Sequence, residues 1–159
     1  MRPAIFCLTI LVSLSACENS TDPFIGFDGG GAITAAQATG NWSFTVQRTD
    51  PVTCAGASLA NGSVLLARLD VLSDGTLGAT SNWRESPTGL VRPLSGAVTL
   101  SSGTTTLIMS GSGGSSSAMD LVGTMTAAGT FTGTLRDPRA GSFPVFGDCG
   151  YTATGGKTG

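Results

Sequence analysis

Histidine is absent from this chain, and lysine occurs only once, at Lys157. Nucleophilic hydrolysis needs a base beside a serine or cysteine, and these two residue types supply almost none here. Charged residues make up only 11% of the sequence, with eight basic and ten acidic side chains. No basic patch appears, so nucleic acid is not an expected partner. The sequence therefore predicts a protein that is not an enzyme and holds no cofactor.

Acidic residues are the remaining candidates for chemistry. Asp137 and Asp148 flank one predicted loop, and Asp50 and Glu85 lie in loops at the same predicted end. Paired acids act on glycosides or bind calcium. The alternative is that these are ordinary solvated loop charges, and no spacing favours a site.

The N-terminus carries one basic residue, Arg2, followed by an apolar run from Ala4 to Leu14 and then small residues. This order is typical of a secretory signal peptide. The run is too short for an anchor helix, because a bilayer core needs roughly 20 apolar residues.

The segment ends in Leu14-Ser15-Ala16-Cys17, which resembles the lipobox of bacterial lipoproteins. The resemblance implies cleavage before Cys17, acylation of its sulfur with a fatty acid such as palmitate, and attachment to the cell envelope. Glu18 replaces the aspartate that retains such lipoproteins at the inner membrane, which implies the outer membrane. An ordinary signal peptide with an incidental cysteine, or an uncleaved anchor, is the alternative.

Three regions follow from these patterns: a signal peptide at 1–16, a lipidated N-terminus and flexible tether at 17–39, and a β-domain at 40–159. The tether is predicted from Gly29-Gly30-Gly31 and from the turn residues around Pro23. Beyond residue 40, apolar residues recur at every second position in short runs between turn residues, which is the strand pattern. The predicted strands span 41–48, 63–72, 76–84, 94–101, 104–111, 118–127, 130–136 and 149–155.

Eight short consecutive strands predict an all-β fold, an antiparallel up-and-down barrel. One alternating set is apolar, as expected for an interior that faces away from water: Trp42, Phe44, Val46, Leu65, Ala67, Leu69, Val71, Leu77, Ala79, Trp83, Leu94, Val98, Leu100, Leu107, Met109, Met119, Leu121, Met125, Phe131, Leu135, Tyr151 and Ala153. A membrane barrel would reverse this pattern and carry aromatic girdles. Interior glycines at 96, 123 and 133 are expected to open space for a ligand.

Tight turns at 73–75, 102–103 and 128–129 alternate with longer connections. In an up-and-down barrel the tight turns share one end with the tether, and the long loops share the other. Cys54 follows the first strand and Cys149 begins the last, so both lie at the long-loop end. In an oxidising compartment we expect them to form a disulfide. Two free buried thiols are the alternative, and an open sandwich would also bring them together.

Gly40-Asn41-Trp42, at the start of the first strand, resembles the Gly-x-Trp motif of lipocalins. The resemblance implies an eight-stranded barrel closed at one end by the tryptophan, with an arginine late in the barrel beside it. Arg136 is the nearest candidate. The motif also resembles small bacterial lipoprotein protease inhibitors, whose disulfide is more local than Cys54 with Cys149. Trp42 as a plain core residue is the alternative.

The C-terminal Gly155-Gly156-Lys157-Thr158 lacks the first glycine of a phosphate-binding loop, since Tyr151 occupies that position. We expect a frayed tail there.

The long-loop end carries the best candidate surface for a ligand or a protein partner: Trp83, Arg84, Arg92, Phe143 and Phe146. Apolar groups with a few charges suit either kind of contact. Phe143 and Phe146 folding inward as a plug is the alternative. The sequence predicts a lipid-anchored envelope protein that binds a small apolar ligand. The alternatives are a protein-binding or protease-inhibitor-like module and a structural envelope lipoprotein without a ligand.

Overall fold

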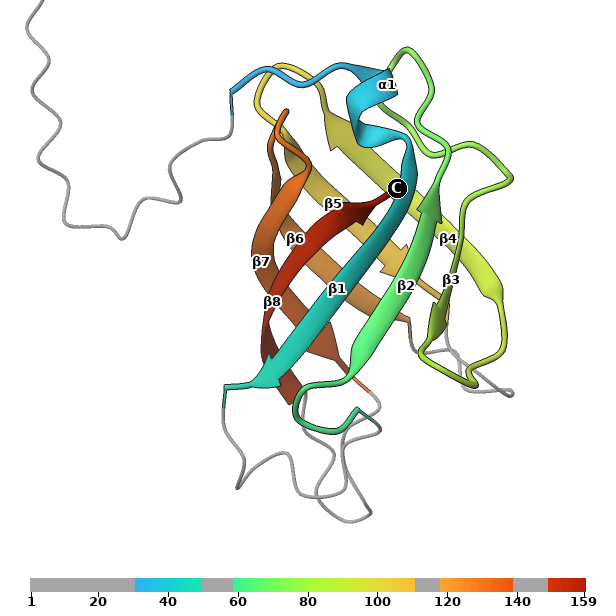
Figure 1. Cartoon of the computed structure of the whole chain (residues 1–159), viewed down its shortest axis with the longest axis vertical. Coiled ribbons are helices and arrows are strands. Elements are labelled where there is room, and N and C mark those ends of the chain that lie inside the picture. The colour runs from blue at the N-terminus through green and yellow to red at the C-terminus, as the bar shows by residue number, and fades with distance from the viewer. Residues whose placement is uncertain (1–30, 50–58, 111–117, 139–148) are drawn as a thin grey trace, which may run out of the picture.

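Alternating apolar and polar residues form eight antiparallel strands, as a computed structural model of the chain shows (Figure 1). The structure describes residues 31–49, 59–110, 118–138 and 149–159. One short helix precedes the strands. The elements are α1 (Ala35–Ala38), β1 (Gly40–Arg48), β2 (Val64–Leu69), β3 (Asn82–Glu85), β4 (Arg92–Thr99), β5 (Thr104–Met109), β6 (Met119–Met125), β7 (Thr130–Asp137) and β8 (Cys149–Thr158).

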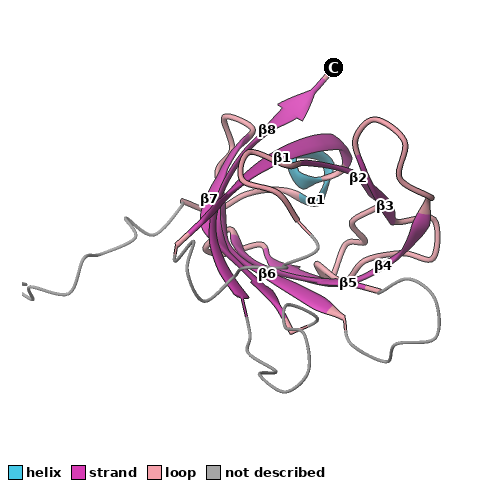
Figure 2. Cartoon of the chain, turned by 90° about the horizontal axis from the view of Figure 1, so that it is seen from below, coloured by secondary structure: helices cyan, strands magenta, loops and turns pink. Residues whose placement is uncertain are grey.

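The first and last strands pair and close the barrel, so the predicted up-and-down topology is confirmed. β1 and β8 are antiparallel over eight residue pairs, from Asn41 opposite Thr158 to Arg48 opposite Tyr151. Viewed from below, the strands form a ring with α1 at its far end (Figure 2). Within the described ranges, no helix has the length and hydropathy needed to cross a membrane.

The predicted interior is confirmed at nearly every position, because the period of two fixes which side chains face inward. Three residues differ. Ala79 is exposed, and Leu77 and Leu100 are only partly buried. Ile33, Ala38 and Leu59, which were not among the predicted interior residues, join the core.

The three tight turns lie at the predicted positions. Each contains a glycine in the left-handed region, Gly75 at φ 87°, Gly103 at φ 71° and Gly129 at φ 78°. Side chains other than glycine rarely adopt this conformation, which is why glycine fixes these turns. All three lie at the end of the barrel that carries α1 (Figure 1).

The predicted third strand, 76–84, is present but begins at residue 82, so its predicted start is wrong. β3 is only four residues long and pairs with β4 at two positions, Asn82 with Pro93 and Trp83 with Arg92. The turn residues 75–77 lie beside the upper part of β4 instead, where Thr76 pairs with Ala97. The turn was predicted correctly, but the residues that follow it lie next to β4. β3 therefore begins only at Asn82, five residues after Leu77.

Residues 33–39 are part of the domain, whereas the sequence predicted a tether up to residue 39. Thr34 caps α1 by accepting from the Gln37 backbone N–H at 3.2 Å, and the Gln37 side chain accepts from the Thr34 backbone N–H at 2.8 Å. This reciprocal capping box stabilises a single helical turn. Trp42 Nε1 donates to the Ala38 carbonyl at 2.8 Å, which holds the turn against the barrel end.

The last strand continues through the predicted frayed tail to Thr158. Lys157 lies opposite Trp42, and its Nζ donates to the carbonyls of Ala36 at 3.3 Å and Gln37 at 3.0 Å. Arg136 lies at the opposite end, opposite Gly150. The basic residue beside the tryptophan is therefore Lys157, where the lipocalin resemblance implied an arginine.

Candidate functional site

In the part of the chain that the structure describes, the barrel interior is occupied by the protein's own side chains. Phe44 is stacked beside Trp42 with ring centroids 6.1 Å apart, and Phe131 meets Phe44 edge-on at 5.1 Å. A void wide enough for a water molecule would expose the side chains around it. Trp42, Phe44, Leu107 and many neighbours have an exposed fraction of 0%. The described interior therefore leaves no space for a ligand beside these residues.

The glycines expected to open the interior are covered instead. A Cβ at Gly123 or Gly133 would lie 2.6 Å or 2.8 Å from Cζ of Phe131, and a Cβ at Gly155 would lie 2.6 Å from Cδ1 of Phe44. Each ring lies on a glycine and fills the volume that a side chain would take. The prediction of space at Gly96 is also wrong, because the Thr106 carbonyl lies against it.

Leu59 closes the interior at the long-loop end. It is 1% exposed, and its carbonyl accepts from Arg48 Nε at 3.1 Å, Arg48 Nη2 at 2.8 Å and Tyr151 Oη at 3.2 Å. Burial raises the pKa of Tyr151, and the carboxylate of Asp137 adds to this rise while the Arg48 guanidinium opposes it. This end is thus held by an apolar residue and three hydrogen bonds.

Trp83, one of the predicted site residues, is 4% exposed and belongs to the core. The Arg92 guanidinium lies over its ring, 5.9 Å from the centroid, within the range of a cation–π contact. Trp83 Nε1 is the one buried side-chain nitrogen of the described residues that has no hydrogen-bond partner. A buried donor left unpaired costs about 1–3 kcal/mol.

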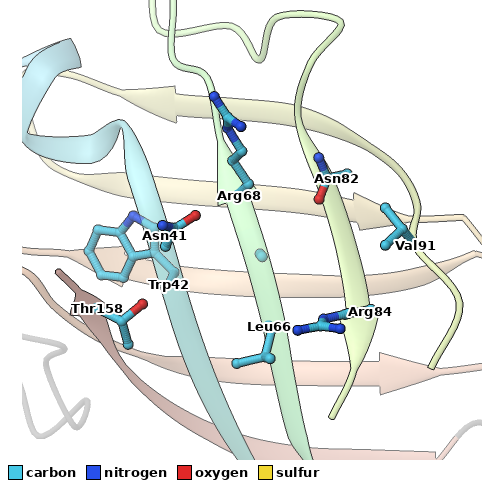
Figure 3. A pocket seen from close by; sticks show the side chains of 9 residues that line it. Asn41, Trp42, Leu66, Arg68, Asn82, Arg84, Val91 and Thr158 are labelled. Carbon is cyan, nitrogen blue, oxygen red and sulfur yellow. The ribbon is translucent and has the colours of Figure 1, made fainter. Parts of the chain in front are cut away.

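Arg84 points outward and lines a groove on the outer face of β1, β2 and β3 (Figure 3). The groove has a volume of about 330 Å³. Leu66 lies on β2 directly opposite Arg84, two residues before Arg68 on the same strand (Figure 3). The residues that line the groove are Asn41, Trp42, Leu66, Ala67, Arg68, Asn82, Arg84, Val91 and Thr158. Because Trp42 is fully buried, the groove presents amides, two guanidinium groups, the Thr158 hydroxyl and aliphatic side chains.

The two arginines give this groove a positive charge without a counter-charge. No carboxylate of the described residues lines it. The guanidinium groups of Arg68 and Arg84 have no hydrogen bond or ion pair in the described structure. Two acids lie close to these arginines in the sequence, and each accepts a hydrogen bond from another residue. Asp70, directly after β2, accepts from Thr80 Oγ1 at 2.8 Å, and Glu85, the last residue of β3, accepts from Ser63 Oγ at 3.2 Å.

Beside the groove, the loop between β3 and β4 presents two large apolar residues. Leu90 is 74% exposed and Val91 is 66% exposed. Exposed aliphatic groups next to charged ones are typical of a contact surface. The groove, with Leu90 and Val91, is therefore the candidate functional site.

Several predicted site residues, Cys17, Cys54, Phe143 and Phe146, lie outside the described residues. Cys149 begins β8 and is 1% exposed, and its predicted bridge to Cys54 stays a prediction. Of the candidate acids, Asp137 is fully buried in β7, and Glu85 lies on β3, which is not adjacent to β7. Among the described residues no three His, Cys, Asp or Glu side chains gather as a metal site would require.

Sequence reasoning missed Asn41, Leu66, Arg68 and Asn82. They lie at outward positions on three neighbouring strands, and their register brings them together: Asn41 and Asn82 both lie opposite Arg68. The only signal in the sequence was an arginine at an outward position in each of two consecutive strands. Comparisons with protein-family models, with curated proteins and with solved structures found no match.

Proposed function

We propose that this chain is a lipid-anchored protein of the bacterial cell envelope whose barrel binds another macromolecule at its outer surface. The observation that carries the proposal is the filled interior. An eight-stranded barrel either holds one small ligand or is filled by side chains. The fully buried Phe44, Leu107 and Met119 favour the second arrangement here.

The anchor in this proposal is Cys17, as the lipobox resemblance implies. The tether would then reach the barrel at the end that carries α1, because α1 leads directly into β1. The long-loop end would point away from the membrane, and the groove would open sideways. Labelling with radioactive palmitate should mark the wild-type protein and leave Cys17→Ser unlabelled. Equal labelling of both would remove the anchor from the proposal.

A photo-crosslinking scan tests the mode of binding. A photoreactive residue is placed at outward positions around the barrel, such as Leu66, Thr106 and Thr132, in bacteria that make the protein. At least one outward position should yield a discrete product of higher mass. The inward position Leu107 serves as the control and should yield none, since it is 0% exposed. Absence of a discrete product at every outward position would contradict surface binding.

The small apolar ligand predicted from the sequence is the second candidate, and the weak seam between β3 and β4 favours it. Among the described residues β3 and β4 form two residue pairs, with one further hydrogen bond from the Leu94 N–H to the Ser81 carbonyl at 3.1 Å, and Trp83, whose Nε1 has no partner there, belongs to one of the pairs. Titration with an apolar fluorescent probe separates the two candidates. Surface binding predicts no saturable uptake by the folded protein, whereas saturable uptake of one probe per chain would support the ligand inside the barrel.

A further inference from the structure

We infer that the groove between Arg68 and Arg84 binds an extended segment of another protein that carries two acidic residues with one residue between them. This inference rests on the proposed function and names the partner's chemistry. Two guanidinium groups that have no partner among the described residues, in a groove whose described lining holds no carboxylate, are complementary to anions. Guanidinium groups recognise carboxylates through two parallel hydrogen bonds.

The register sets the spacing of the two acids. Arg68 lies opposite Asn82, and Arg84 is two residues further along β3, so the arginines are diagonal neighbours. Such neighbours on adjacent strands are about 7–8 Å apart. In an extended peptide, side chains two residues apart lie on the same face, about 6.6–6.8 Å apart. A Glu-x-Glu segment therefore repeats its two acidic residues at close to the backbone spacing of the two arginines, whose flexible side chains can reach the two carboxylates.

The rest of the lining favours a peptide over a nucleic acid. Asn41 offers an amide donor and acceptor, and Asn82, whose Nδ2 also donates to the Thr80 carbonyl at 3.0 Å, keeps a second N–H and its oxygen. These groups match the N–H and C=O groups of a peptide backbone. Leu66 and the exposed Val91 offer aliphatic contact. Bases commonly stack on exposed aromatic rings, and the one ring in the described lining, Trp42, is fully buried.

The charge of the whole chain makes the groove selective. The formal net charge is −2, so an acidic peptide is weakly repelled by the protein as a whole. Binding of such a peptide then depends on Arg68 and Arg84 themselves. Removing either one should weaken binding far more than an equal change in net charge elsewhere on the surface.

The test is fluorescence anisotropy with the purified full-length chain in detergent micelles. The probe is a labelled ten-residue peptide whose only charges are two glutamates around one valine. One comparison peptide has glutamines in place of the glutamates. The other has the glutamates adjacent, so that in an extended chain they point to opposite faces. The probe should bind at least tenfold more tightly than either comparison peptide.

Arg68→Ala and Arg84→Ala should each weaken binding of the probe about tenfold or more, as expected for loss of a hydrogen-bonded charge pair. Thr132→Glu is the matched control. It lowers the net charge by one, as each arginine variant does, at an exposed position on β7. It should leave the affinity within twofold of wild type. Both arginine variants and the control should show unchanged circular dichroism.

Four results would overturn the inference: no binding of the probe, equal binding of the glutamine peptide, wild-type affinity in both arginine variants, or an equal loss in Thr132→Glu. Tighter binding of polygalacturonate, an acidic sugar polymer, would also overturn it. So would a tenfold gain in affinity on deleting residues 19–29, because the chain's own acidic segment would then be the occupant. In the photo-crosslinking scan, a product at Thr132 or Thr106 but not at Leu66 would overturn the inference that the groove is the binding site. It would leave the proposed function standing.

Discussion

Replacing Phe131 with alanine is expected to cost about 4 kcal/mol in the free energy of unfolding. Truncating a buried phenylalanine costs about 3–5 kcal/mol, and the cost rises when the site cannot collapse. Phe131 is 1% exposed and lies on Gly123 and Gly133, which have no side chains to move into the space. Its edge-on contact with Phe44 contributes about 0.5–1.5 kcal/mol beyond burial, so the upper half of the range applies.

The measurement is urea unfolding followed by circular dichroism, with wild type and Phe131→Ala compared at equal slope. Val122→Ala is the control on the neighbouring strand. Val122 faces outward and is 43% exposed, so its loss should be about 0.5 kcal/mol or less. Phe131→Ala should also take up benzene, because a cavity lined by apolar groups stays dry and binds apolar molecules. A loss below about 1.5 kcal/mol in Phe131→Ala would refute the enclosed ring and the filled barrel with it.

Three further predictions test the ends and the lining of the barrel. Gly155→Ala should destabilise the fold by about 1–3 kcal/mol through overpacking, since its Cβ would lie 2.6 Å from the Phe44 ring, whereas Gly156→Ala, with its nearest atom at 3.9 Å, should be nearly neutral in the same urea titration. Lys157→Met removes two hydrogen bonds to α1 and should speed hydrogen exchange of the Trp42 indole N–H, and an unchanged exchange rate would show that the lysine does not hold the helix. Burial raises the pKa of Tyr151, so the contribution of its neutral hydroxyl to stability is complete below the unfolded pKa of about 10 and is lost as pH rises above that value. Tyr151→Phe should therefore flatten the decline of stability between about pH 10 and pH 12. An unchanged decline would exclude the buried hydroxyl as the cause of the decline.

The inward face of the barrel was predictable because it depends on local alternation. Trp42, Phe44 and Phe131 each lie within a run of period two, and this period alone assigns them to the inside. The tight turns were predictable for the same reason, since a glycine such as Gly103 marks a turn without reference to the rest of the chain.

Features that depend on contacts between distant segments were not predictable. The residues after Gly75 alternate like a strand, but alternation does not say which neighbour they pair with, and here they lie beside β4. Gly133 suggested space because it has no side chain. The Phe131 ring covers it, and the position of that ring depends on tertiary packing, which the sequence does not show. The single turn α1 is too short for a periodic signal, and its capping box consists of only Thr34 and Gln37.

The groove also depends on contacts between distant segments, so it was not predictable from the sequence. Arg84 was predicted as a contact residue from its own position, but its partner in the groove, Arg68, depends on the register between β2 and β3. A shift of this register by one residue would place the two arginines apart and replace Leu66 in the groove. The register between β2 and β3 therefore decides which residues line the groove.

The central claim is that the barrel is solid and that binding occurs outside it. Methyl NMR of the chain under xenon tests this most directly, because xenon enters apolar cavities. The account predicts that the methyl signals of Leu65, Leu107 and Met119 stay in place at pressures that shift exposed methyl groups such as those of Leu90. Saturable shifts of these inward methyl signals would reveal an open interior and contradict the account.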